Sequence, residues 1–206
     1  MKKRLKKFLC LMLCAALLLP NVPLARARES RTEETYDIYP VVREIEYDGT
    51  RFHLAEQVNV VYETGIDDAT KAYLSEVLTE KGIDATVVSE PVEGAFNILL
   101  GIHGSGGAAD AYAAALTLKT DDLYDRYDGY LLEAKDKQIT IVGGDRDGAF
   151  YAVATLKMML SSFEDGHLLG AQIEDYAGTE YRGFVEASTA AGTTRPAPSS
   201  WNLPGM

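Results

Sequence analysis

The chain has 206 residues, with 31 Asp or Glu against 20 Lys or Arg and a formal net charge of −11. An acidic surface repels nucleic acid and anionic lipid, so the composition argues against partners of both kinds. Its two cysteines, Cys10 and Cys14, lie near the N-terminus. The rest of the chain therefore lacks disulfides and thiol chemistry, and must be stabilised by a hydrophobic core.

Residues 1–27 have the pattern of a secretory signal peptide. A basic start precedes the apolar run from Phe8 to Leu19, and a small-x-small cleavage site ends at Ala27. The run is shorter than the ~20 apolar residues of a spanning helix, and Leu13 stands before Cys14 where lipidation would need a small residue. We expect a secreted protein, released from the membrane. Cleavage would leave 14 Lys and Arg against 31 Asp and Glu, a formal charge of −17.

The first predicted elements follow a charged, turn-rich segment. Residues 28–38 are expected to form a flexible, solvated lead-in. Apolar alternation on both sides of Asp48-Gly49 predicts a β-hairpin, and residues 58–61 predict the next strand. A helix is expected between the segments Gly65-Ile66-Asp67 and Lys81-Gly82. Its predicted buried face comprises Ala69, Ala72, Tyr73, Val77 and Leu78.

Two more strands are expected at residues 86–88 and 96–102. The second is apolar nearly throughout, which predicts a strand buried on both faces in mid-sheet. The glycine-rich segment His103–Gly107 then leads into an alanine-rich helix, expected from Ala108 to about Leu118. Such a loop can hold a phosphate or a sugar. No lysine follows, however, and Asp110 lies at the helix start, so a flexible surface loop is the favoured interpretation.

The pair Asp121-Asp122 is followed by Tyr124, Tyr127 and Tyr130. Neighbouring carboxylates with aromatic rings resemble a sugar site, in which one acid donates a proton and the rings stack on the pyranose. The alternative is a solvated acidic turn whose tyrosine rings pack and whose hydroxyls stay wet. Nothing in the local sequence buries either carboxylate, so the second interpretation is favoured.

The segment Ile139–Leu160 predicts a strand, a glycine turn and a helix, preceded by a hairpin partner at residues 130–134. Asp145 and Asp147 fall at the helix start, where they can accept free N–H groups and meet the positive end of the helix dipole. The spacing from Gly143 to Gly148 would suit a nucleotide loop. Ala149-Phe150 nevertheless stand where that motif needs Lys and Ser or Thr, so packing is favoured over phosphate binding. The predicted buried face of the helix comprises Phe150, Val153, Leu156 and Leu160.

A short return segment is expected at residues 166–176. His53, His103 and His167 are far apart in sequence and are expected on the surface or in loops, without a metal site. No Gly-x-Ser-x-Gly elbow is present, and no catalytic residue or cofactor is predicted. The order of elements predicts one domain over residues 39–178 of α+β class, an α/β-type two-layer sandwich with helices packed on one face of a mixed sheet.

Several of these segments together resemble a known family. They look like the non-catalytic N-terminal domain of secreted bacterial β-N-acetylglucosaminidases of glycoside hydrolase family 84, the hyaluronidase or O-GlcNAcase-like family, and the similar domain of family 20 β-hexosaminidases. The matching segments are Tyr39-Pro40, the Gly49 turn, Val58-Asn59-Val60-Val61, the strand from Asn97 to Gly101, Tyr130-Leu131-Leu132, the run from Ile139 to Gly144, Gly148-Ala149-Phe150-Tyr151, Thr155-Leu156-Lys157 and Ile173-Glu174-Asp175-Tyr176.

The motif Tyr181–Glu186 resembles the start of the catalytic barrel in that family. Family members continue with Gly-Phe-Tyr-Gly, whereas this chain reads Ala187-Ser188-Thr189-Ala190. Loss of one base from codons for Gly-Phe-Tyr-Gly would give these four residues. We therefore expect a barrel start at residues 179–186, truncated by a frameshift, and an out-of-frame, disordered tail at 187–206.

The resemblance implies substrate-assisted hydrolysis by two neighbouring Asp residues of the barrel, a known exception to the two-carboxylate scheme. Those residues would lie beyond Glu186, so this chain is expected to be an inactive accessory domain. Its implied partners are the catalytic barrel of the full-length parent and N-acetylglucosamine-containing glycans. One alternative is a free-standing extracellular carbohydrate-binding module that uses Tyr124, Tyr127, Tyr130 and the Gly104–Gly107 loop. A nucleotide-binding domain is the least favoured alternative.

Overall fold

The computed structural model describes residues 34–179. The predicted signal peptide, the barrel motif Tyr181–Glu186 and the tail at 187–206 lie outside the described residues. Within residues 34–179, none of the helices combines the length and apolar character needed to cross a bilayer.

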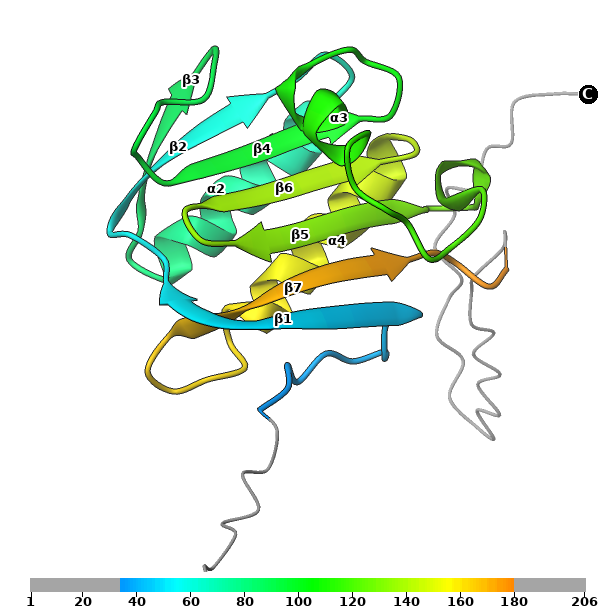
Figure 1. Ribbon diagram of the computed structural model, residues 1–206. Helices are drawn as coiled ribbons and strands as arrows, with labels where there is room; N and C mark the ends of the chain where they lie inside the picture. Colours follow the sequence, from blue (N-terminus) through cyan, green and yellow to red (C-terminus); the bar gives the residue numbers. More distant parts are fainter. Residues whose placement is uncertain (1–33, 180–206) are drawn as a thin grey trace, which may run out of the picture. The chain divides into compact units, whose positions relative to one another are not determined.

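Seven strands of the described part form one mixed sheet in the order β1-β7-β5-β6-β4-β2-β3 (Figure 1). Strands β3, β2, β4 and β6 pair in parallel, whereas β5 is antiparallel to both β6 and β7, and β1 is antiparallel to β7. The mixed sheet predicted from the sequence is therefore confirmed. The strands are β1 (Glu44–His53), β2 (Gln57–Tyr62), β3 (Asp84–Val88), β4 (Asn97–Ile102), β5 (Tyr130–Lys135), β6 (Gln138–Gly143) and β7 (His167–Asp175).

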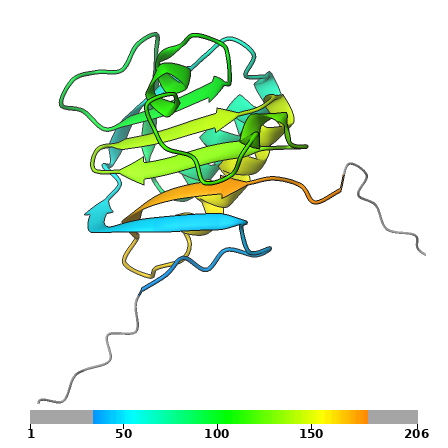
Figure 2. The same cartoon turned by 45° about the vertical axis from the view of Figure 1, so that its right-hand side comes forward.

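Helices α2 (Asp68–Glu80) and α4 (Arg146–Met159) cover one face of the sheet, and the short α3 (Ala108–Ala113) lies over the other (Figures 1 and 2). The alternation of β4 shows the two faces: Leu100 joins the core under α2 and α4, whereas Leu99 packs with α3. The predicted α+β class is confirmed. The expectation that helices pack on one face is right for α2 and α4 and wrong for α3, because Leu99 and its neighbours give the second face apolar positions to cover.

The predicted hairpin at Asp48-Gly49 is wrong, because β1 is one strand that pairs with β7 along its length. The register shifts between Tyr47 and Arg51, so the turn residues form a bulge. Asp48 Oδ1 stabilises this bulge by accepting the N–H of Thr50 at 2.8 Å. Opposite the bulge, a side chain on Gly170 would overlap those of Asp48 and Thr50. A turn-like sequence is thus used to bend an edge strand.

Two helices differ in detail from their predictions. The buried stripe of α2 is Thr70, Leu74, Val77 and Leu78, so Ala69 and Ala72 are exposed. Helix α3 ends at Ala113, short of the predicted Leu118, because the chain then bends across the sheet to β7. There the carboxylate of Glu174 accepts the N–H groups of Lys119 at 2.9 Å and Thr120 at 2.7 Å.

The predicted lead-in at residues 28–38 is wrong for its last part, since Tyr36 and Ile38 are buried in the core. The hydroxyl of Tyr36 accepts the N–H of Leu169 at 2.7 Å and donates to the carbonyl oxygen of Leu169 at 2.6 Å. Both hydrogen bonds are buried and join residues 133 positions apart. The packed domain therefore begins before residue 39.

Replacing Tyr36 with Phe should lower the free energy of unfolding by about 1–3 kcal/mol, because two backbone groups of buried Leu169 lose their partner. Urea denaturation of the variant and of Tyr39→Phe measures this, since Tyr39 is 83% exposed and serves as the matched control. Equal stability of the two variants would show that the Tyr36 contact does not anchor the N-terminal segment.

Candidate functional site

The carboxyl ends of β2, β4 and β6 meet at one edge of the sheet, since these strands run parallel. Ligands of α/β sheets commonly bind at such an edge. Both glycine-rich segments singled out in the sequence, His103–Gly107 and Gly143–Gly148, lie there, because each directly follows a strand. Whether they hold a ligand depends on which groups already use their backbone N–H donors.

The His103–Gly107 loop is filled by two carboxylates of the chain itself. Glu63, just after β2, accepts the N–H of Ala109 and the hydroxyl of Ser105. Asp110 accepts the N–H groups of Gly104 at 3.0 Å and Gly106 at 2.9 Å. Partial burial would raise the pKa of Asp110, but these amides and the nearby His103 hold it below its usual value. The donors that a phosphate would need are therefore in use, and the loop is pinned rather than a free surface loop.

Glu63 was missed by sequence reasoning, although the loop is built around it. A side chain at Gly101 or Gly107 would overlap the Glu63 carboxylate. The two glycines in the sequence indicate that some group packs closely against the backbone there. They do not indicate that this group is Glu63.

The second glycine segment is a packing unit, as predicted. Asp145 caps α4 by accepting the N–H of Gly148 at 2.8 Å, and Asp147 lies in the first helical turn. The N–H of Gly144 donates to the carbonyl oxygen of Gly129 at 2.7 Å. A Cβ atom on Gly148 would collide with the same carbonyl oxygen. The loop before β5 thus occupies the space in which a nucleotide phosphate would have to lie.

The three tyrosines considered for a sugar site, Tyr124, Tyr127 and Tyr130, do not form one common surface. Tyr130 is buried on the helix side of the sheet, where its hydroxyl bonds Thr155 Oγ1 at 2.6 Å. Tyr124 stacks on the ring of His103, with 4.2 Å between the ring centroids, and Tyr127 is 55% exposed. The structure therefore brings Tyr124 beside the glycine loop but does not bring the three tyrosines of the expected module together.

Asp121 and Asp122 are exposed in a turn before β5. Asp122 has a positive φ of 55° and precedes the 3-10 helix η1 (Leu123–Asp125). The favoured prediction of a solvated acidic turn matches this placement, but its expectation that the tyrosine hydroxyls stay wet is wrong for Tyr124 and Tyr130, whose hydroxyls are buried.

The prediction of surface or loop histidines is wrong for His167, which is 2% exposed in β7. Its ring lies 6.4 Å from that of His53 and stacks on Phe163 at 4.0 Å. His167 Nδ1 contacts Asp165 and Arg51 Nη2. The hydrogen bond from His167 lowers the pKa of Asp165 to about 2. Within residues 34–179, His, Cys, Asp and Glu side chains form no group arranged to hold a metal ion.

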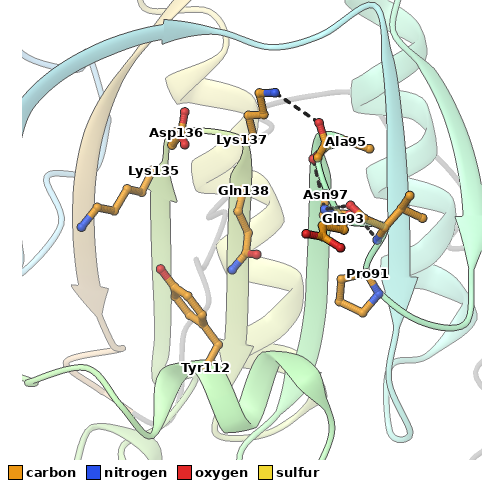
Figure 3. Close-up of a pocket in the computed structure, with 11 residues that line it drawn as sticks. Pro91, Glu93, Ala95, Asn97, Tyr112, Lys135, Asp136, Lys137 and Gln138 are labelled. Atoms are coloured by element: carbon orange, nitrogen blue, oxygen red, sulfur yellow. Dashed lines mark hydrogen bonds between the residues drawn. The ribbon is translucent and has the colours of Figure 1, made fainter.

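A groove of about 790 Å³ lies at the opposite edge of the sheet, on the face that carries α3 (Figure 3). Its floor is the start of β4 and of β6, and its walls are Tyr112 and the loop Pro91–Ala95. The side chain of Asn97 fixes this loop: its Oδ1 accepts the N–H of Val92 at 2.9 Å, and its Nδ2 donates to the carbonyl oxygens of Val92 and Ala95. Sequence reasoning missed the groove. The polar Asn97 at the start of an otherwise apolar strand is the sequence feature that could have indicated the groove.

Fold and site together define a mixed-sheet domain whose glycine turns are filled by its own backbone and carboxylates. Residues 35–176 match the family model described as glycosyl hydrolase family 20, domain 2. The chain belongs to this family, which confirms the resemblance to the N-terminal domain of family 84 and family 20 hexosaminidases.

One solved structure supports the same assignment, and two others, less than 25% identical, share the fold. The structure of CpGH84D is 37% identical with a TM-score of 0.70, and the match covers 75% of this chain and 26% of that one. The structure of CpGH84B is 22% identical with a TM-score of 0.55, covering 68% of this chain and 22% of the other. The GH20 exo β-N-acetylglucosaminidase from Vibrio harveyi, in complex with N-acetylglucosamine, is 21% identical with a TM-score of 0.50. The match covers 70% of this chain and 20% of that one. The chain thus spans about a quarter or less of these proteins.

Proposed function

We propose that the domain is the accessory part of a secreted β-N-acetylglucosaminidase-like glycoside hydrolase that degrades glycans, and that it performs no hydrolysis itself. The match of residues 35–176 to domain 2 of family 20 carries this proposal. The 37% identity to CpGH84D, of which the match covers 26%, supports a role as one part of a larger protein. The signal-peptide pattern of residues 1–27 supports secretion.

The roles of the carboxylates support the non-catalytic part of the proposal. A glycosidase needs an acid whose environment raises its pKa and places it beside the scissile bond. Glu63, Asp110, Asp145 and Glu174 instead accept backbone N–H groups and fix loops or a helix start. Asp121 and Asp122, the one pair considered for sugar chemistry, lie exposed in a turn.

The 206-residue chain should release no nitrophenol from 4-nitrophenyl N-acetyl-β-glucosaminide above the buffer rate, because Glu63, Asp110, Asp145 and Glu174 serve the fold and Asp175, whose pKa is raised by burial, also accepts a backbone N–H, that of Arg43. Absorbance over hours measures this, with the Asp121→Asn, Asp122→Asn double variant as the matched control. Turnover by the wild type that disappears in the double variant would overturn the non-catalytic role.

An aromatic surface, formed by Tyr73, Phe150 and Tyr151, lies on the outer side of α2 and α4. Tyr73 and Phe150 stack with 5.0 Å between ring centroids, and Phe150 meets Tyr151 edge-on at 6.0 Å. Phe150 is 36% and Tyr151 is 40% exposed. Phe150 was predicted to be buried with the rest of the α4 stripe, but it turns toward α2 and remains partly exposed. Large exposed aromatic groups of this kind commonly mark interaction sites.

The aromatic surface lies at the edge from which the chain leaves the sheet. Tyr130 of β5 pairs with Gly143 on one side and with Asp175 on the other. The end of β7 is therefore close to the end of β6, where α4 begins. We assign the aromatic surface as the contact with the catalytic barrel that follows in the parent protein.

A chimera tests this contact: residues 36–176 replace the matching domain of CpGH84D. In the chimera, Phe150→Ser with Tyr151→Ser should lower the melting temperature by several degrees more than in the isolated chain, since only the chimera loses a domain contact. Val87→Ser, at a side chain 66% exposed on β3, is the control. An equal loss in chimera and isolated chain would place the following domain elsewhere.

A further inference from the structure

We propose that the groove beside Tyr112 is a saccharide-binding subsite that takes the ring face of a neutral pyranose chain. The inference rests on the proposed function, since it gives the accessory domain a binding role toward the same class of substrate. It concerns different residues from those predicted for a sugar site, because the structure separates Tyr124, Tyr127 and Tyr130.

The first wall of the groove is the ring of Tyr112, which projects from α3 over the strands (Figure 3). Burial and the nearby carboxylate of Glu133 on β5 raise the pKa of the Tyr112 hydroxyl above its usual value. Tyr112 therefore offers a partly exposed aromatic surface on which a pyranose ring can stack.

The second wall is fixed by hydrogen bonds. Asn97 holds both ends of the loop at Val92 and Ala95, and Lys137 Nζ donates to the carbonyl oxygen of Gly94 at 3.2 Å. Pro91 adds an apolar surface, and the carboxylate of Glu93 is exposed as an acceptor for hydroxyl groups. Little conformational entropy remains to be lost on binding, which favours a weakly interacting ligand such as a sugar.

The floor offers hydrogen bonds without a net charge. Gln138 Nε2 donates to Thr140 Oγ1 at 2.9 Å, which orients the amide and leaves its oxygen as an acceptor. Lys137 is engaged by Gly94, and Lys135 points away from the middle of the groove (Figure 3). The volume of about 790 Å³ lies within the usual range for small-molecule sites, ~300–1,000 Å³. A neutral, hydroxyl-rich ligand fits this lining better than a phosphate or an apolar peptide.

Titration of the ¹⁵N-labelled 206-residue chain with N,N′,N″-triacetylchitotriose tests the proposal by NMR. Saturable amide shifts should appear at Gly94, Gln138 and Tyr112. Tyr112→Ala should weaken binding about tenfold through loss of the stacking surface. Glu93→Ala, on an exposed loop and independent of folding, should weaken it about threefold. Tyr127→Ala, which removes an exposed tyrosine remote from the groove residues, should leave the affinity unchanged.

Three outcomes would overturn the subsite: no saturable shifts at millimolar ligand, shifts confined to other residues, or unchanged affinity in both Tyr112→Ala and Glu93→Ala. The activity assay and the chimera do not involve the groove. A failed titration would therefore leave the accessory-domain proposal standing, and a failed chimera would leave the subsite to be judged by its own titration.

Discussion

The fold depends most on the close approach of two backbone segments at the carboxyl edge of the sheet. The carbonyl oxygen of Gly129 accepts the N–H of Gly144 and lies against Gly148 at the start of α4. Only residues without a Cβ atom allow this contact, and it brings β5, β6 and α4 into one unit. Because β5 then pairs with β7, the contact also positions the strand that carries the chain out of the sheet.

The same edge shows how a fold can use the chemistry of a ligand site for its own stability. Glu63 and Asp110 occupy the amide-rich loop after β4, and Asp145 occupies the start of α4. Carboxylates satisfy helix-start N–H groups as phosphates do in nucleotide-binding proteins. The chain's own carboxylates therefore stabilise the strand–glycine–helix pattern. The aromatic surface and the groove beside Tyr112 lie away from these carboxylates.

Local patterns predicted the elements whose partners are close in sequence. The β5–β6 hairpin, the Asp145 cap and the buried β4 followed from spacing alone. The hairpin at Asp48-Gly49 failed because β1 pairs with β7, more than a hundred residues later. Glu63 and the groove could not be predicted for the same reason, since each depends on side chains from separate elements. The order of elements predicted the mixed sheet and the α+β class, and family resemblance supplied the accessory role.

The substitution Gly148→Ala tests most directly whether the glycine turn is built for packing. A packed turn and an open ligand cradle predict changes of opposite sign in the free energy of unfolding. If the turn were an open cradle, alanine would raise the free energy of unfolding by up to about 1 kcal/mol through its better helix propensity. Since the Gly129 carbonyl oxygen fills the space, we expect a loss of about 1–3 kcal/mol from overpacking. Denaturant unfolding that shows destabilisation supports a turn built for packing, and a stabilised variant would contradict it.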